Sequence, residues 1–125
     1  MNATLLAQNA YRTQAQTIRT ERGLEYDAIA RITHNLCMAA RDGRDNMIAV
    51  ARAIHDNRRL WTILATDVAD PENPLPNALR AQIIYLAEYT HHHSSKVLRD
   101  AAPIAPLIEV NTAIMRGLGE RRSTS

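Results

Sequence analysis

The stretch from Met47 to Val68, MIAVARAIHDNRRLWTILATDV, decides the fold, because its apolar residues recur in steps of three and four. This spacing places them on one face of a helix and predicts a helix from about Asn46 to Ala69. The buried stripe of that helix is predicted to consist of Met47, Val50, Ile54, Asn57, Trp61, Leu64 and Val68. One amide, Asn57, therefore lies at the centre of an apolar stripe.

A buried amide needs hydrogen-bond partners on a neighbouring helix. Asn57 offers two donors and one acceptor, and leaving buried polar groups unsatisfied costs roughly 1–3 kcal/mol. We therefore expect Asn57 to fix helix register or to recognise a partner. Polar residues also fall on the predicted stripes of later helices, namely Thr90, His93 and Asn111. They are expected to form one polar network inside the protein; the alternative is that some of them line a groove for a partner.

Four further helical segments and no strand are predicted, at about 3–16, 20–41 and 77–100 and from Ile104 or Leu107 to Leu118. Gly43 is suited to the left-handed conformation that ends many helices, and it should terminate the second segment. Three prolines between residues 70 and 76 predict a stiff corner after the third segment. The fourth segment carries the apolar spacing through Leu79, Ile83, Leu86, Thr90, His93 and Val97.

The expected fold is all-α, a compact antiparallel helical bundle of about five helices, the first of them short. Residues 1–125 should form a single domain, since compact domains most often have roughly 100–150 residues. Within it, residues 1–16 are predicted to be a short docking helix. Gly117 and Gly119 should end the last helix and leave residues 119–125 as a mobile tail.

The composition favours packed helices over a nucleic-acid-binding surface. Hydrophobic residues make up 46% of the chain, but phenylalanine is absent, so the core must consist mainly of leucine, isoleucine, alanine and valine. The net charge is only +2, with basic and acidic residues interspersed. Neither a basic stripe nor a set of aromatic stacking platforms is present, so RNA binding is possible but not favoured. Cys37 is the single cysteine, which excludes an internal disulfide.

No catalytic or metal-binding pattern emerges from the residues. His91, His92 and His93 are adjacent and diverge by about 100 degrees each on a helix, whereas good metal ligands are three or four residues apart. We expect His93 to be partly buried and hydrogen-bonded and the other two to be solvated. Phosphate-binding loops, nucleotide fingerprints, paired cysteines and nucleophile elbows are all missing. The expectation is a protein that is not an enzyme, without cofactor or metal.

Three blocks in order along the chain resemble the flagellar biosynthesis regulator FlaF family. They are HDNRRLW at His55–Trp61, YLAEY at Tyr85–Tyr89 and LIEVNTAIMRGL at Leu107–Leu118. The likeness runs from about Ala10 to Leu118 and so covers nearly the whole chain. It implies a small all-helical cytoplasmic protein of flagellated bacteria that is needed for flagellin production, acts on flagellin or its messenger, and has no enzymatic activity.

The resemblance suggests a flagellin-directed export chaperone that is also a positive regulator of flagellin synthesis. Flagellins polymerise through terminal helical segments that are disordered before assembly, so a chaperone must cover their apolar faces reversibly. Leu60 and Tyr89 stand beside the main stripes and are expected to form the rim of an inter-helical groove. The predicted partner-binding residues are Leu60, Tyr89, Tyr11, Asn57, Trp61 and Met115.

Tyr11 is included because the short segment before the bundle is similar in arrangement to that of the flagellin chaperone FliS. This similarity suggests that residues 1–16 cover a partner groove or compete for it. The chain shows no signal peptide pattern, and no window approaches 18 consecutive apolar residues. A cytoplasmic location without membrane insertion is therefore expected.

Two alternative functions stay open at this stage. The first is an RNA-binding regulator of flagellin translation, which would need a continuous basic face joining Arg52, Arg58 and Arg59. The second is an adaptor that counters a translational repressor of flagellin, namely the FlbT protein that accompanies this family. The sequence alone does not separate this adaptor from the chaperone.

Overall fold

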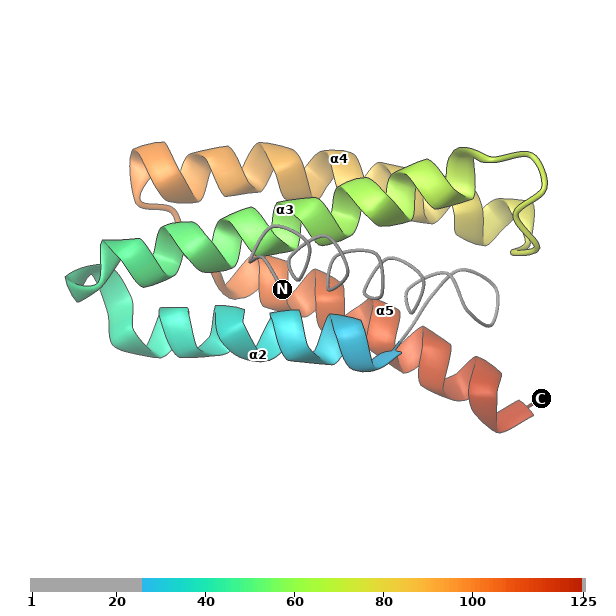
Figure 1. The fold of residues 1–125 in the computed structure, drawn as a ribbon, viewed down its shortest axis with the longest axis horizontal. Helices are drawn as coiled ribbons and strands as arrows, with labels where there is room; N and C mark the ends of the chain where they lie inside the picture. The colour runs from blue at the N-terminus through green and yellow to red at the C-terminus, as the bar shows by residue number, and fades with distance from the viewer. Residues whose placement is uncertain (1–25, 125) are drawn as a thin grey trace, which may run out of the picture.

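The computed structural model describes residues 26–124, which contain four α-helices, one 3-10 helix and no strand. With the labels of Figure 1, the helices are α2 (Tyr26–Asp42), η1 (Gly43–Asp45), α3 (Met47–Ala69), α4 (Asn77–Asp100) and α5 (Ala105–Thr124). The all-α prediction is confirmed. The helix predicted at residues 3–16, which includes Tyr11, lies outside the described residues, as does the start of the segment predicted at 20–41.

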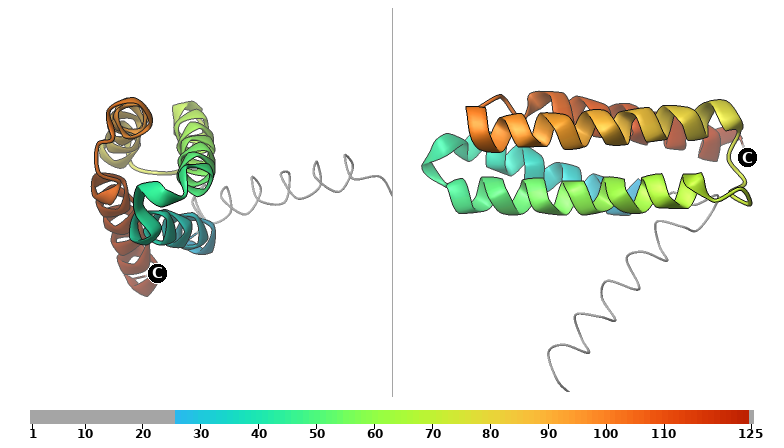
Figure 2. Two further views of the ribbon diagram at one scale, coloured as in Figure 1. Left: turned by 90° about the vertical axis from the view of Figure 1, so that its left-hand side faces the viewer. Right: turned by 90° about the horizontal axis from the view of Figure 1, so that it is seen from above.

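The four α-helices run alternately in opposite directions and form an antiparallel bundle (Figure 1). Helix α3 packs against both α2 and α4, and α5 packs mainly against α2 and meets α4 over a shorter stretch. Helix α5 slants relative to the other three (Figure 2). None of the described helices combines the length and the apolar character needed to cross a membrane.

Local sequence signals explain most of the helix ends. The side chain of Asn46 accepts a hydrogen bond of 3.1 Å from the backbone N–H of Ala49, which caps the start of α3. Gly43 has a φ of +67°, as predicted for the residue that follows α2. Helix α4 ends differently, because Ala101 adopts a left-handed φ of +57° although it is not a glycine. Pro103 follows two residues later and prevents the helix from continuing.

The predicted end of the last helix is wrong. Helix α5 continues through Thr124, past Gly117 and Gly119, so residues 119–124 have helical backbone where a tail was expected. A glycine inside a helix costs only about 1 kcal/mol relative to alanine, which weakens a helix without terminating it. A Cβ atom at Gly117 would meet nothing within 4 Å, so no close approach of another element requires glycine there.

The corner between α3 and α4 is held by side chains as well as by its prolines. The Arg80 guanidinium donates to two backbone oxygens, from Nε to Val68 at 2.8 Å and from Nη2 to Asp70 at 2.9 Å. The side chain of Asn73 accepts from the backbone N–H of Leu75 at 3.0 Å. Leu75 itself is buried in the core. These contacts attach the corner to the bundle, in agreement with the predicted stiffness.

The apolar core consists of two clusters, one toward each end of the bundle. The first joins buried residues of all four helices and the corner: Ala28, Ile29, Ile32, Leu60, Trp61, Ile63, Leu64, Val68, Leu75, Ile83, Ala87 and Ile114. The second contains Leu36, Ala39, Val50, Ala53, Ile54, Val97, Ile104 and Leu107. The predicted α3 stripe is confirmed except at Met47, which is 44% exposed at the start of the helix.

On α4 the core face lies to one side of the predicted stripe. Its fully buried residues are Ile83, Ala87, Thr90, Ser94 and Val97, whereas the predicted core residues Leu79, Leu86 and His93 are only half-buried. Alanine and serine are small enough to lie against α3, but they contribute little to a hydrophobic pattern. The apolar spacing of the sequence therefore indicated the helix correctly and its orientation only approximately.

Candidate functional site

All five buried polar residues of the described chain lie between the two apolar clusters. They are Thr33, Asn57, Thr90, Ser94 and Asn111, and we call this set the polar layer. Each of the four α-helices contributes at least one member. On every helix, that member lies between the residues of the first apolar cluster and those of the second. The polar layer therefore divides the core near the middle of the bundle.

Asn111 is the centre of the polar layer and connects three helices. Its Nδ2 donates to Asn57 Oδ1 at 2.9 Å and to Thr33 Oγ1 at 3.0 Å. Its Oδ1 accepts from the indole Nε1 of Trp61 at 2.8 Å. Thr33 in turn donates to the backbone oxygen of Ile29 at 2.7 Å. Side chains of α2, α3 and α5 are thus joined by buried hydrogen bonds, which favour one register of these helices.

The sequence predicted this network in part. The link between Asn57 and Asn111 was expected, but His93 lies outside the polar layer and bonds to Pro103. Thr33 and Trp61 were not expected in it. Trp61 lies one turn from Asn57 on the same predicted stripe, and a buried indole N–H needs an acceptor. The sequence therefore did contain a signal that Trp61 takes part in this network.

Helix α4 is not hydrogen-bonded into the polar layer. Within the described residues, Thr90 Oγ1 and Ser94 Oγ are buried without a hydrogen-bond partner, and so is Nδ2 of Asn57. Such groups carry a desolvation cost that a bond would offset. The polar layer therefore stabilises the association of α2, α3 and α5 more than it stabilises the position of α4.

On its outer side, α4 displays a row of aromatic side chains. Tyr85, Tyr89 and His93 are spaced by four residues and so lie along one face of the helix, and we call them the tyrosine row. The rings of Tyr89 and His93 are stacked, with centroids 5.8 Å apart and planes inclined by 11°. His93 Nε2 donates to the backbone oxygen of Pro103 at 2.8 Å, which fixes the imidazole.

The tyrosines of this row are accessible to solvent. Tyr85 is 67% exposed and Tyr89 is 37% exposed, although their rings are large and mostly apolar. Of the two tyrosine rings, that of Tyr89 is restricted by its stacking on His93. His93 is partly buried and hydrogen-bonded, as predicted.

His91 belongs to a different contact, on the side of α4 that faces α3. Arg58 Nη2 donates to the backbone oxygen of His91 at 3.0 Å and to Ser95 Oγ at 2.6 Å. The imidazole Nε2 of His91 lies 3.3 Å from the hydroxyl of Thr62. The expectation that His91 is solvated was therefore wrong: this residue is half-buried against α3.

The environment of His91 makes the stability of the bundle depend on pH. Burial, and secondly the charge of Arg58, lower the pKa of His91 below its ordinary value of 6.5. The unfolded chain therefore binds a proton at His91 at a higher pH than the folded chain does. Stability contributed by His91 is fully present above pH 6.5 and is lost as the pH falls from there to the lowered pKa of the folded state.

We expect His91→Gln to make the melting temperature less sensitive to pH between about 7.5 and 5.5. Differential scanning calorimetry at several pH values would measure this. The matched control is His92→Gln, which removes an exposed imidazole next in sequence to His91. Equal pH profiles for the parent and His91→Gln would contradict the role assigned to this imidazole.

The structure places the predicted partner-binding residues at different depths. Leu60 is only 1% exposed and belongs to the first apolar cluster, so the expectation that it forms an accessible groove rim was wrong. It lies beside the α3 stripe, but α2 and α4 flank α3 on either side and bury a wide face of it. Trp61 and Asn57 are fully buried, and Met115 packs against the first cluster. Among the described candidates, Tyr89 is the accessible one.

The three arginines that RNA binding would require do not form one basic face. Arg52 lines a hollow between α2 and α3, whereas Arg58 bonds to α4 on another side of the helix. Residues 52 and 58 are six apart, a spacing that places them on different sides of a helix. Within the described residues, moreover, no three histidine, cysteine or acidic side chains gather in a way that could hold a metal ion.

The described residues thus form an antiparallel all-α bundle with hydrogen bonds in its polar layer and an exposed aromatic row on α4. The family model of the flagellar protein FlaF matches residues 7–118, so the chain belongs to the FlaF family. This match confirms the resemblance seen in the sequence and establishes a role connected with the flagellum. Neither a curated protein nor a solved structure gives a significant match to the chain.

Proposed function

We propose that the protein binds flagellin as an export chaperone and thereby also promotes flagellin synthesis, acting in the cytoplasm by binding and not by catalysis. Membership of the FlaF family supports the connection with the flagellum. The observation that carries the proposal is the tyrosine row. Tyr85 and Tyr89 present apolar ring surface along one face of α4, next to a stacked imidazole that holds Tyr89 in place.

The tyrosine row fits an amphipathic helical segment better than it fits RNA. An apolar helix face binds by laying side chains from successive turns against a complementary apolar surface, and aromatic residues contribute much of the affinity of such contacts. Aromatic rings can also stack on bases, but single-strand binders combine them with a positively charged groove. Glu88 precedes Tyr89 in the sequence, and residues 85–93 of α4 contain no arginine or lysine.

We expect Tyr89→Asp to weaken binding to monomeric flagellin by about 30-fold or more, because hot-spot residues contribute about 2 kcal/mol or more. Tyr85→Asp should weaken binding as well. Isothermal titration calorimetry would measure both, and circular dichroism would verify that the variants stay helical. Ile48→Asp is a suitable control, because Ile48 is 73% exposed and belongs to α3, whereas the tyrosine row belongs to α4.

Flagellins truncated at either end would locate the bound segment. Loss of binding on removal of one terminal segment supports a chaperone that covers assembly surfaces. If flagellin binds with equal affinity to the parent chain and to both tyrosine variants, the tyrosine row is not the binding surface. If full-length flagellin does not bind at all while the FlbT repressor or the flagellin leader RNA does, the protein is a regulator and not a chaperone.

A further inference from the structure

Four buried polar side-chain atoms in the described part of the chain have no hydrogen-bond partner within the protein, and all four belong to α3 and α4. They are Nδ2 of Asn57, Nε of Arg58, Oγ1 of Thr90 and Oγ of Ser94. Asn57, Thr90 and Ser94 are 0% exposed and belong to the polar layer. Folded proteins contain few such atoms, so their concentration at one pair of helices needs an explanation.

The contacts of Arg58 show that Asn57 lies level with Ser94. Arg58 follows Asn57 on α3, and its Nη2 donates to Oγ of Ser95 on α4 at 2.6 Å. Ser94 directly precedes Ser95. Thr90 lies one turn before Ser94 on the same buried face of α4. The unpartnered atoms of α3 and of α4 therefore lie at neighbouring levels of the bundle.

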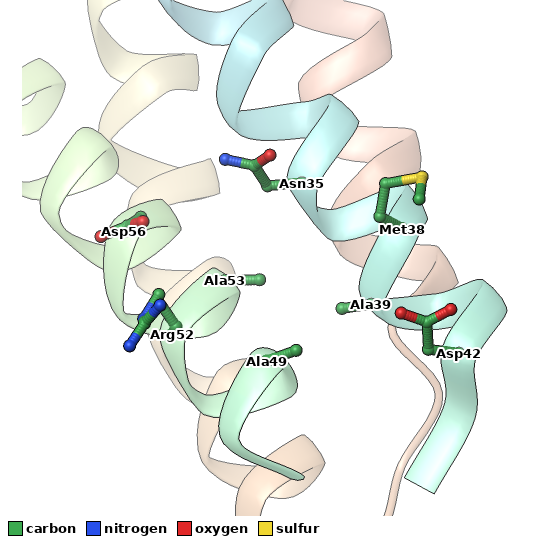
Figure 3. Close-up of a pocket in the computed structure, with 8 residues that line it drawn as sticks. All are labelled: Asn35, Met38, Ala39, Asp42, Ala49, Arg52, Ala53 and Asp56. Atoms are coloured by element: carbon green, nitrogen blue, oxygen red, sulfur yellow. The ribbon is translucent and has the colours of Figure 1, made fainter. Parts of the chain in front are cut away.

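Asn57 faces the core between two flanks of α3. One flank faces α2 and bears Ala53 and Asp56, which line the hollow shown in Figure 3. The other flank faces α4 and bears Arg58, which bonds to that helix and is itself only half-buried. The fully buried groups of Asn57, Thr90 and Ser94 lie away from both edges, and we call them the α3–α4 polar site.

The hydroxyls of Thr90 and Ser94 do not use the acceptor that helical hydroxyls commonly use. A serine or threonine within a helix often donates to the backbone oxygen four residues before it. Thr33, Ser95 and Thr112 do so, with O···O distances of 2.7 Å, 3.4 Å and 2.8 Å. In the described structure Thr90 and Ser94 make no such bond. Their hydroxyls can therefore donate to, and accept from, a group outside α4.

The amide of Asn57 is held in one orientation. Its Oδ1 accepts from Nδ2 of Asn111 at 2.9 Å, and reversing the amide would place two N–H groups against each other. The α3–α4 polar site thus offers an N–H donor and two hydroxyls. A ligand that satisfies all three must both accept and donate, and it must be small. It must also be uncharged, because burying a charge among apolar helices is costly.

We propose that a single water molecule binds in the α3–α4 polar site. It accepts from Nδ2 of Asn57 and hydrogen-bonds to the hydroxyls of Thr90 and Ser94. Buried water molecules usually make about three hydrogen bonds to groups that are otherwise unsatisfied. This water connects α4, the helix that bears the tyrosine row, to the polar layer formed by the other helices.

Oxygen-17 relaxation dispersion of water in a solution of the full chain tests the proposal. It counts buried water molecules of long residence time, and hydroxyl protons that exchange with water do not contribute to it. The double variant Thr90→Val/Ser94→Ala removes both hydroxyls and is expected to hold one long-lived water molecule fewer than the parent chain. Thr112→Val is the matched control and should keep the parent's count, because the Thr112 hydroxyl donates to Ile108 in its own helix. Circular dichroism would verify that the variants are folded.

The melting temperature of Thr90→Val gives a second test, in which the sign of the change decides. Valine has nearly the shape and the helix propensity of threonine, so the exchange removes mainly the hydroxyl. If a water molecule bonds to this hydroxyl, the melting temperature should fall by about 3–6 °C. If the hydroxyl is buried without any partner, its removal should raise the melting temperature instead.

Three results would each overturn the proposal. The first is an equal count of long-lived water molecules in the parent chain and the double variant, and the second is a raised melting temperature of Thr90→Val. The third is a stabilisation by chloride but not by sulfate that the double variant loses, which would assign the α3–α4 polar site to an anion. None of these measurements involves flagellin, so their outcome is independent of the proposed chaperone function.

Discussion

Leu60→Asp is expected to abolish the folded state. The Leu60 side chain is 1% exposed in the cluster that contains Trp61 and Ile83, and a carboxylate placed there would have no solvent and no cationic partner within that cluster. Burying an unpaired charge costs more than the roughly 5–15 kcal/mol by which typical domains are stable, unless the group is protonated or the structure opens. Circular dichroism at neutral pH should show loss of the cooperative thermal transition.

Two further variants test whether the loss of folding is caused by the burial of the new charge. Leu60→Ala should retain the fold but lower the free energy of unfolding by about 2–5 kcal/mol, the usual range for a deleted core leucine. Ile48→Asp introduces the same charge at an exposed site on the same helix and should change stability by no more than about 0.5 kcal/mol. A folded Leu60→Asp chain with parent-like stability would show that Leu60 is accessible after all.

Asn111→Leu is expected to lower the free energy of unfolding by about 3 kcal/mol or more. The substitution leaves the indole N–H of Trp61 and the Oδ1 of Asn57 buried without partners, at roughly 1–3 kcal/mol each. It also removes a bond to Thr33. Urea denaturation would measure the change. Thr112→Val is the matched control, because Thr112 is half-buried and its hydroxyl donates only to the backbone oxygen of Ile108 in its own helix.

Asn57→Leu should affect stability much less than Asn111→Leu does. Asn57 makes a single hydrogen bond in the described structure, and its Nδ2 is already buried without a partner. Replacing it removes one unsatisfied donor while it leaves one donor of Asn111 unpaired, so the change should be within about 1 kcal/mol. In the double variant the two effects should not add, because both residues share one bond. Additive effects would contradict a direct coupling.

The sequence was sufficient for the fold class and for most helix boundaries, because these depend on local signals. The three- and four-residue spacing defined α3, the prolines defined the corner, and α4 was predicted with the bounds 77–100 that the structure has. The end of α5 was predicted too early, at Leu118. The two glycines at 117 and 119 lower the stability of the helix, but by too little to terminate it.

The orientation of residues next to a stripe depends on tertiary packing, and the sequence was less informative there. Leu60 and Tyr89 both stand beside a stripe, yet Leu60 is enclosed by neighbouring helices and Tyr89 faces outward. Helical spacing predicts which residues share a face, but it does not show how wide a face the other helices will cover. The hollow between α2 and α3 could not be predicted either, because it depends on which alanines of two helices come to face each other.

The division of the apolar core into two clusters bears on how the bundle opens. Within one cluster, each hydrophobic contact stabilises its neighbours. Local unfolding that begins in one cluster must break the hydrogen bonds of Asn111 before it reaches the other cluster. The two ends of the molecule can therefore act as separate cooperative units, in the manner of foldons. Amide exchange should distinguish them: protection at the Trp61 end can persist while the end near the turn between α2 and α3 exchanges with solvent.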